Sequence, residues 1–225
     1  MDLNVTPFNM NLMDKYEITF ETWNKLALLY QEKFMDIDIY DGTYDRFCQL
    51  AGMVGHSILE IGCGPGNITR HMVSYNANFN ITAVDVAPEM VKLAKANNPT
   101  VTVEVMDCRN LTGFSDLFDG IIAGFCIPYL SNEDCSDFIK ACTFLLQPLG
   151  ILYISAIKGD YSKSGFESGS TGNKAFVYYY DEAFFETVFE KNGLKILNKF
   201  EIEYKAQHKP DQIHLVYIAQ KSSLQ

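Results

Sequence analysis

Between residues 19 and 34, hydrophobic side chains recur every three or four positions, which is the spacing of one face of an α-helix. The stripe consists of Phe20, Trp23, Ala27, Tyr30 and Phe34. A second, shorter helical pattern covers residues 44–51. The first 55 residues are therefore predicted to form a helical cap.

From residue 57 the pattern changes to short runs of β-branched and aliphatic residues, each typical of a strand buried on both faces. Five such runs occupy residues 57–62, 81–86, 101–107, 119–124 and 150–157. Helical stretches separate them; one begins at Pro88, and another is capped by Ser131 and runs to Leu146. This alternation predicts a doubly wound α/β fold, with a parallel sheet and helices on both faces.

The C-terminal third departs from the alternation. A helix is predicted over residues 181–191, followed by extended runs at 194–204 and 213–220 whose short link indicates an antiparallel hairpin. The Gly- and Ser-rich segment 159–174 is predicted to be a mobile lid. The length of 225 residues suits one domain, residues 1–225, with a cap (1–55), a core (56–158) and a lid, helix and hairpin (159–225).

Composition excludes several partners. The chain has 18 Lys and Arg against 28 Asp and Glu, a formal charge of −10, and no basic run, so a nucleic-acid backbone is a poor partner. Residues 1–13 have neither a basic start nor an apolar stretch, and the longest apolar run is too short to span a bilayer, which predicts a cytoplasmic protein that does not bind membranes. The six cysteines form no Cys-x-x-Cys pair, so buried free thiols are expected and neither a metal site nor a disulfide is predicted.

A glycine loop carries the strongest chemical signal. The first strand ends in Gly62-Cys63-Gly64-Pro65-Gly66, where the absence of Cβ atoms lets the backbone approach a ligand closely. Roughly twenty residues further on, Asp85 ends the second strand, where a carboxylate can accept both hydroxyls of an adenosine ribose. Asp107, after the third strand, can accept from an adenine amino group. Together these residues predict an adenosine-containing cofactor.

At these residues the chain resembles the class I S-adenosylmethionine (SAM)-dependent methyltransferases, particularly the type 11/25 group of bacterial small-molecule enzymes. The resemblance covers about residues 20–144. It implies a Rossmann-like, mostly parallel seven-stranded sheet of order 3-2-1-4-5-7-6 with the last strand antiparallel. It also implies SAM as the cofactor and S-adenosylhomocysteine as its product.

The same resemblance implies roles for individual residues. Gly62, Cys63 and Gly64 would lie against the methionine part of SAM, with Glu60 bracing the loop and Asp85 holding the ribose. The remaining implied contacts are Val86 and Met90 beside the adenine, Asp107 and Cys108 at its edge, Phe125 near the sulfonium, and Tyr30 closing the pocket. For Val86, Met90 and Tyr30, ordinary core packing is the alternative.

Methyl transfer from a sulfonium is an in-line displacement that mainly requires alignment in a dry pocket, so no fixed catalytic residue is demanded. Tyr129, His208 and His214 are the candidates for a catalytic role, although surface histidines more often have none. Residues 125–129 lack the Asn/Asp-Pro-Pro-Tyr/Phe stretch of amino-directed nucleic-acid methyltransferases. We therefore expect a small-molecule methyl acceptor, and a chain that acts as a monomer or a homodimer.

Two alternatives remain open from the sequence. One is a catalytically silent SAM-binding partner or regulatory protein. The other is an NAD(P)-binding Rossmann enzyme, which the G-x-G-x-G spacing and the terminal hairpin disfavour.

Overall fold

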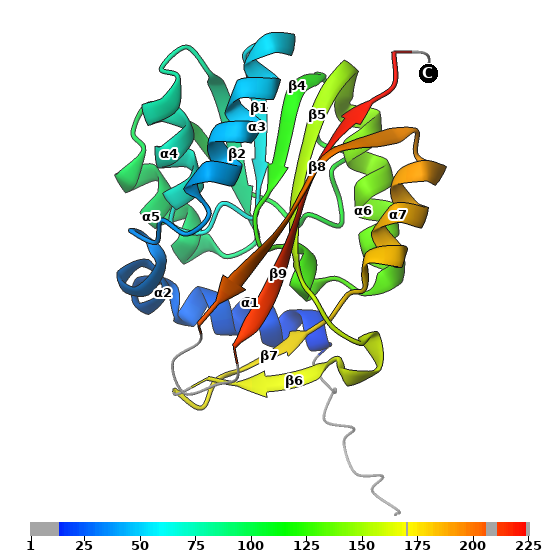
Figure 1. Cartoon of the computed structure of the whole chain (residues 1–225). Helices are drawn as coiled ribbons and strands as arrows, with labels where there is room; N and C mark the ends of the chain where they lie inside the picture. The colour runs from blue at the N-terminus through cyan, green and yellow to red at the C-terminus, as the bar shows by residue number, and fades with distance from the viewer. Residues whose placement is uncertain (1–13, 170, 206–210, 224–225) are drawn as a thin grey trace, which may run out of the picture.

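The computed structural model describes residues 14–169, 171–205 and 211–223, and its central layer is a seven-stranded sheet (Figure 1). The strand order is β3-β2-β1-β4-β5-β9-β8. The strands are β1 (Ser57–Ile61), β2 (Asn80–Asp85), β3 (Thr102–Val105), β4 (Phe118–Ala123), β5 (Leu146–Ile157), β8 (Leu194–Tyr204) and β9 (Gln212–Lys221). All neighbours are parallel except that β9 is antiparallel to both β5 and β8, which confirms the predicted doubly wound order 3-2-1-4-5-7-6.

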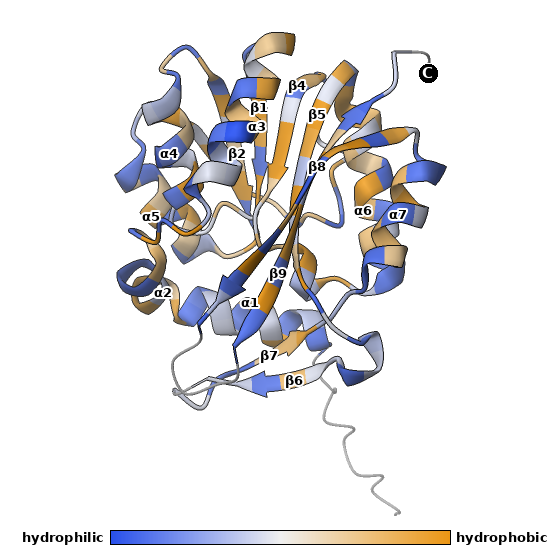
Figure 2. Cartoon of the chain, in the orientation of Figure 1, coloured by the Kyte–Doolittle hydropathy of each residue, from blue (hydrophilic) through white to orange (hydrophobic). Residues whose placement is uncertain are grey.

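Helices cover both faces of the sheet (Figure 1). One face carries α3 (Asp41–Val54), α4 (Asn67–Tyr75) and α5 (Pro88–Asn97), and the other carries α6 (Asn132–Leu145) and α7 (Glu182–Lys191). Ser131 caps α6 as predicted, because its Oγ accepts from the N–H of Asp134 at 3.1 Å. Figure 2 shows hydrophobic residues concentrated in the central strands, and the edge strand β8 alternates between more and less exposed positions.

The predicted single helix over residues 19–34 is wrong. Two helices, α1 (Lys15–Lys25) and α2 (Ala27–Phe34), meet at Leu26, whose backbone leaves the helical region at φ −96° and ψ 10°. Seven residues of straight helix rise about 10.5 Å, but the rings of Trp23 and Tyr30 lie only 5.6 Å apart, edge to face. The break at Leu26 therefore allows the ring of Trp23, in α1, to pack against the ring of Tyr30, in α2. The helix predicted over residues 44–51 corresponds to α3, which is longer and covers Asp41–Val54.

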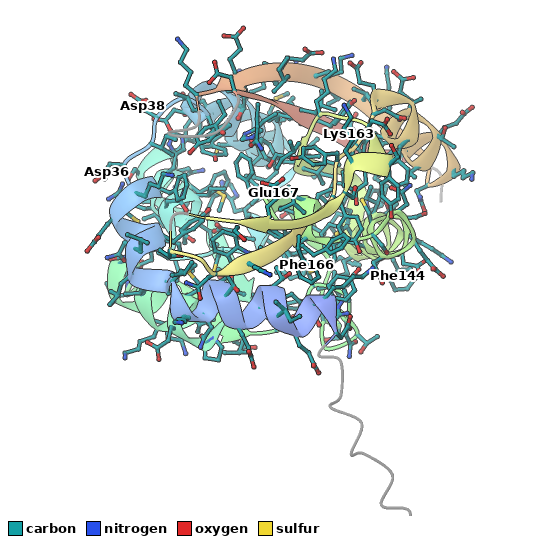
Figure 3. All side chains as sticks on the ribbon, turned by 90° about the horizontal axis from the view of Figure 1, so that it is seen from below. Asp36, Asp38, Phe144, Lys163, Phe166 and Glu167 are labelled. Atoms are coloured by element: carbon teal, nitrogen blue, oxygen red, sulfur yellow. The ribbon has the colours of Figure 1, made fainter. Side chains whose placement is uncertain are left out.

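The segment predicted to be a lid loop contains a β-hairpin instead. After the short helix η2 (Tyr161–Lys163), β6 (Gly165–Ser168) pairs antiparallel with β7 (Lys174–Val177) in a separate two-stranded sheet. The hairpin docks on α1, because the Thr22 Oγ1 donates to the carbonyl of Lys174 at 2.6 Å and the N–H of Phe176 donates to Thr19 Oγ1 at 2.9 Å. Figure 3, seen from below, shows the hairpin beside α1 at the end of the sheet. We call α1, α2 and this hairpin the cap assembly.

A buried tyrosine fastens the cap assembly to the sheet domain. The hydroxyl of Tyr16, in α1, donates to the carboxylate of Asp134 and accepts from the N–H of Ser131 at 3.1 Å. Tyr16 itself is 6% exposed. The start of α1 is thus bonded to the start of α6, which lies 115 residues further along the chain.

We expect Tyr16→Phe to reduce the free energy of unfolding by roughly 1.5–3 kcal/mol, because it removes a bond to a charged acceptor and leaves a part-buried N–H without its partner. Urea unfolding would measure this loss, and hydrogen exchange should show it first in α1. Tyr75→Phe, at a half-exposed ring, is the control and should change neither measurement. Equal stabilities of the two variants would contradict this role of the Tyr16 hydroxyl.

Candidate cofactor site

The loop after β1 turns sharply through glycines that take positive φ. Gly62, Gly64 and Gly66 have φ values of 71°, 53° and 87°. At Gly62 a Cβ would also lie 2.9 Å from the Cβ of Cys126, so any other residue would be both strained and in collision. The N–H groups of Gly62 and Cys63 donate to the carbonyl of Val84, at 2.8 and 3.0 Å, and hold the loop against the end of β2.

Asp85 organises the backbone around this loop. One carboxylate oxygen accepts from the N–H of Gly64 at 2.9 Å, and the other accepts from the N–H of Ala87, also at 2.9 Å. Burial raises the pKa of Asp85, while the bonds from these N–H groups lower it. The carboxylate thereby fixes the glycine loop and the entrance to α5 in one arrangement.

A cavity opens at this edge of the sheet, between the strand ends and the cap assembly. The space between its lining atoms is about 710 Å³ when the open mouth is included. The cap contributes Thr19, Phe20, Trp23 and Tyr30, and the sheet contributes Gly62, Gly64, Asp85, Val86, Met90, Met106, Cys108, Gly124, Phe125, Cys126, Tyr129 and Leu130. Among these described lining residues, Asp85 is the only Asp, Glu, Lys, Arg or His.

Phe125 enters the cavity from a strained backbone. Its φ of 64° is rare for a residue with a side chain. Its N–H donates to Ser155 Oγ at 2.9 Å, and its ring packs edge to face against Tyr40 and His214 at centroid distances of 5.0 and 5.1 Å. Strain of this kind persists where neighbours hold the residue in place, and it is concentrated at functional sites.

The structure brings most of the predicted cofactor residues to this cavity. Those that line it are Tyr30, Gly62, Gly64, Asp85, Val86, Met90, Cys108 and Phe125. Two others are buried and do not line the cavity: Cys63, within the loop, is 2% exposed, and Glu60, in β1, is 1% exposed. Their predicted roles beside the cofactor remain predictions.

Glu60 is an acid buried in an apolar setting. One of its oxygens accepts from Thr69 Oγ1 at 2.5 Å, while the other has no hydrogen-bond partner. Burial raises the pKa of Glu60 to about 8, which the bond from Thr69 only partly opposes. Glu60 is therefore mostly protonated at neutral pH.

Asp107 lies after β3 as predicted, but its carboxylate is bonded to Arg109. It accepts from Arg109 Nε at 3.0 Å and Nη2 at 2.6 Å. The guanidinium of Arg109 in turn lies 4.1 Å from the ring centre of Tyr16. Asp107 thus connects the third strand to the cap, and its bond to an adenine remains a prediction.

The three catalytic candidates have different positions. Tyr129 lines the cavity, with its ring 5.5 Å from that of Trp23. His214 is 5% exposed, with Nδ1 2.7 Å from the hydroxyl of Tyr40 and Nε2 3.3 Å from Gln212 Oε1. Burial lowers the pKa of His214 to about 4, so it is neutral at physiological pH. His208 lies outside the described residues.

The sequence interpretation missed the contribution of α1. Thr19, Phe20 and Trp23 line the cavity, although Tyr30 was the one residue of the helical stripe predicted to close it. The sequence did contain a signal for this contribution, because Thr19 and Trp23 are four residues apart and therefore share one face of the helix. Met106 and Cys126 also line the cavity beside residues that were predicted.

Residues 14–169, 171–205 and 211–223 contain no group of three or more His, Cys, Asp or Glu side chains arranged to hold a metal ion. The six cysteines are free thiols, and five of them are buried. No described helix combines the length and the hydropathy that crossing a membrane requires.

Comparisons with known proteins find methyltransferases among the similar sequences and structures. Residues 58–150 match the family described as "Methyltransferase domain". The putative methyltransferase 235L of Invertebrate iridescent virus 6 is 27% identical over 118 residues, which cover 52% of this chain and 43% of that protein. The ubiquinone biosynthesis O-methyltransferase of Xanthomonas oryzae is 33% identical over 113 residues, which cover 47% and 44%.

Solved structures extend the likeness to nearly the whole chain. Magnesium protoporphyrin IX methyltransferase from Synechocystis PCC 6803, with bound SAM, superposes with a TM-score of 0.69 at 15% identity, over 94% of this chain and 99% of that one. This likeness shows that the chain has the fold of the class I SAM-dependent methyltransferases, and residues 58–150 carry the match to the methyltransferase domain family. The chain covers about half the length of the two curated relatives named above.

We expect Glu60→Gln to change how stability depends on pH. Glu60 keeps its proton in the folded chain up to about pH 8 but loses it near 4.5 when unfolded, so wild-type stability falls as pH rises through this window. A difference of one bound proton between the folded and unfolded states changes the free energy of unfolding by roughly 1.4 kcal/mol per pH unit. Glutamine removes the titrating group, so the free energy of unfolding of the variant should increase relative to that of the wild type from pH 5 to pH 8.

Urea unfolding of the ligand-free protein at pH 5, 6, 7 and 8 measures this difference. Glu104→Gln, at an exposed position on β3, is the matched control and should follow the wild-type pH curve. If the curves of wild type and Glu60→Gln run parallel, Glu60 is not a buried protonated acid.

Proposed function

We propose that this chain transfers a methyl group from SAM to a small-molecule acceptor. The observation that carries the proposal is the cavity, in which the glycine loop, Asp85 and an aromatic wall converge at the carboxyl ends of the strands. Ligands of doubly wound sheets bind at this edge. SAM, when bound, supplies the activated methyl group on its sulfonium.

The residues of the cavity have distinct tasks in this proposal. Asp85 accepts hydrogen bonds from the ribose hydroxyls, since an ionised carboxylate has acceptor positions beyond the two that Gly64 and Ala87 occupy. Val86 and Met90 enclose the adenine. Phe125 and Tyr129 face the reacting end, where aromatic rings stabilise positive charge and exclude water.

Alignment, rather than proton removal, is the main contribution we propose for the described residues. His214 is neutral, but both of its nitrogens lie against protein partners and its pKa is about 4, which makes it a weak base. Its proposed role is to hold Phe125 in place through ring contact. The hydroxyl of Tyr129 remains a catalytic candidate, and burial raises its pKa well above the usual value.

A small acceptor fits the enclosed and largely apolar cavity. Two of the related proteins are named for ubiquinone biosynthesis and for magnesium protoporphyrin IX, which favours a small molecule over a macromolecule. The formal charge of −10 opposes binding to a nucleic-acid backbone.

Binding of the cofactor product can be followed without a label, because Trp23 is the single tryptophan of the chain and lines the cavity. Titration with S-adenosylhomocysteine should change its fluorescence in a saturable way. Asp85→Asn should weaken this binding by roughly 10- to 100-fold, as expected for lost bonds to a charged acceptor. Asp116→Asn, which neutralises an exposed aspartate away from the cavity, is the control and should bind like the wild type.

Saturable binding of NADH in place of S-adenosylhomocysteine would reject the proposal in favour of a nicotinamide enzyme. Methyl transfer itself is tested with methyl-labelled SAM and a small-molecule extract, in which label should move to a low-mass product. Tight binding of S-adenosylhomocysteine with no transfer to any acceptor would favour the silent SAM-binding alternative.

A further inference from the structure

The indole N–H of Trp23 is buried and has no hydrogen-bond partner in the protein. The other buried side-chain atoms without a partner, among the described residues, belong to Glu60, Asn132, Tyr178 and Tyr217. None of those residues lines the cavity, whereas Trp23 does. An indole nitrogen can only donate, and an unmade bond of this kind costs about 1–3 kcal/mol.

The rest of α1 shows how the cap satisfies its buried polar groups. Thr19 and Thr22 are both buried, and both bond to the hairpin, through Phe176 and Lys174 respectively. Trp23 is the next residue along the same helix, yet its donor meets no protein acceptor. If Trp23 only docked the helix, a phenylalanine ring would do so equally well. The unmatched donor therefore points to a partner outside the protein.

The surroundings of Trp23 indicate which part of a ligand lies nearest. Its ring packs with Ala87 and Met90, at the start of α5, and edge to face against Tyr30 at 5.6 Å. Ala87 directly follows Asp85 and Val86, the residues assigned above to ribose and adenine, and Met90 was assigned to the adenine with Val86. The indole ring also lies 5.5 Å from the ring of Tyr129, so Trp23 extends from the nucleoside side of the cavity toward the reacting end, with two of its contacts at the start of α5.

We propose that the Trp23 N–H donates a hydrogen bond to the adenosine part of the bound cofactor, so that binding completes the polar contacts of the cap. This inference rests on the proposed function, because it takes the ligand to be SAM or its product. It makes Trp23 a binding residue of the cavity as well as a packing residue of the cap. The bound ligand would supply the acceptor that the Trp23 N–H lacks in the free protein.

Trp23→Phe tests the proposal, because it keeps an aromatic ring and deletes the donor. Isothermal titration with S-adenosylhomocysteine and with 5′-methylthioadenosine, which lacks the amino-acid portion, should show about tenfold weaker binding of each ligand, by the same factor. The thermal midpoint of the ligand-free variant should fall only slightly, through the packing that the smaller ring loses, because no hydrogen bond within the protein is lost. Tyr217→Phe, which removes an unpartnered hydroxyl beneath α7, is the control and should leave both affinities unchanged.

Each other result has a defined meaning. A lower midpoint with unchanged affinities would overturn the proposal and assign Trp23 to packing alone. Weaker binding of S-adenosylhomocysteine only would place the N–H at the amino-acid end and overturn the adenosine assignment. If the wild type binds neither ligand, the proposed function fails, and this outcome is distinguishable from a failure of the Trp23 contact.

Discussion

The carboxylate of Asp85 is the interaction on which the site depends. By accepting from the N–H groups of Gly64 and Ala87, it joins the loop after β1 to the start of α5. This is possible because β1 and β2 are parallel neighbours in register, with Ile61 opposite Val84, so their carboxyl ends reach the same edge of the sheet. The glycines at positive φ, the position of Val86 and the shape of the cavity floor all follow from this arrangement. A buried acid therefore shapes the backbone as well as offering acceptors to a ligand.

The walls above this floor are built differently, from rings rather than hydrogen bonds. Phe125 and Tyr129 come from the segment after β4 and Trp23 comes from α1, and ring contacts position all three. Phe125 shows the backbone strain that this wall requires, since its φ of 64° is held by the bond to Ser155 and its ring is held by His214. Under the proposed function, the polar floor would bind the nucleoside, and the aromatic wall would keep water away from the reacting end.

The sheet and its order were predictable from sequence because β-branched runs, capping residues and the glycine loop are local signals, and strand alternation restricts the topology. Asp85 was predictable for the same reason. The break at Leu26 was not, because the hydrophobic stripe continues through it and only tertiary contacts of Trp23 and Tyr30 favour the bend. The hairpin β6–β7 was missed because its strands are four residues long and bind a helix rather than the main sheet. The pairing of Asp107 with Arg109 depends on side-chain geometry that spacing does not encode.

The attachment of the hairpin to α1 also has a consequence for the order in which the molecule forms. Thr22 and Lys174 are 152 residues apart in sequence, and Thr19 and Phe176 are 157 apart. During synthesis, α1 leaves the ribosome long before the strand that covers it, and contacts of such high sequence separation form slowly. The sheet core around β1 and β4 can assemble first, while the roof of the cavity waits for the last third of the chain. A growing chain can thus form the floor of the cavity early, while α1 is fastened over it only after β7 (Lys174–Val177) has been made.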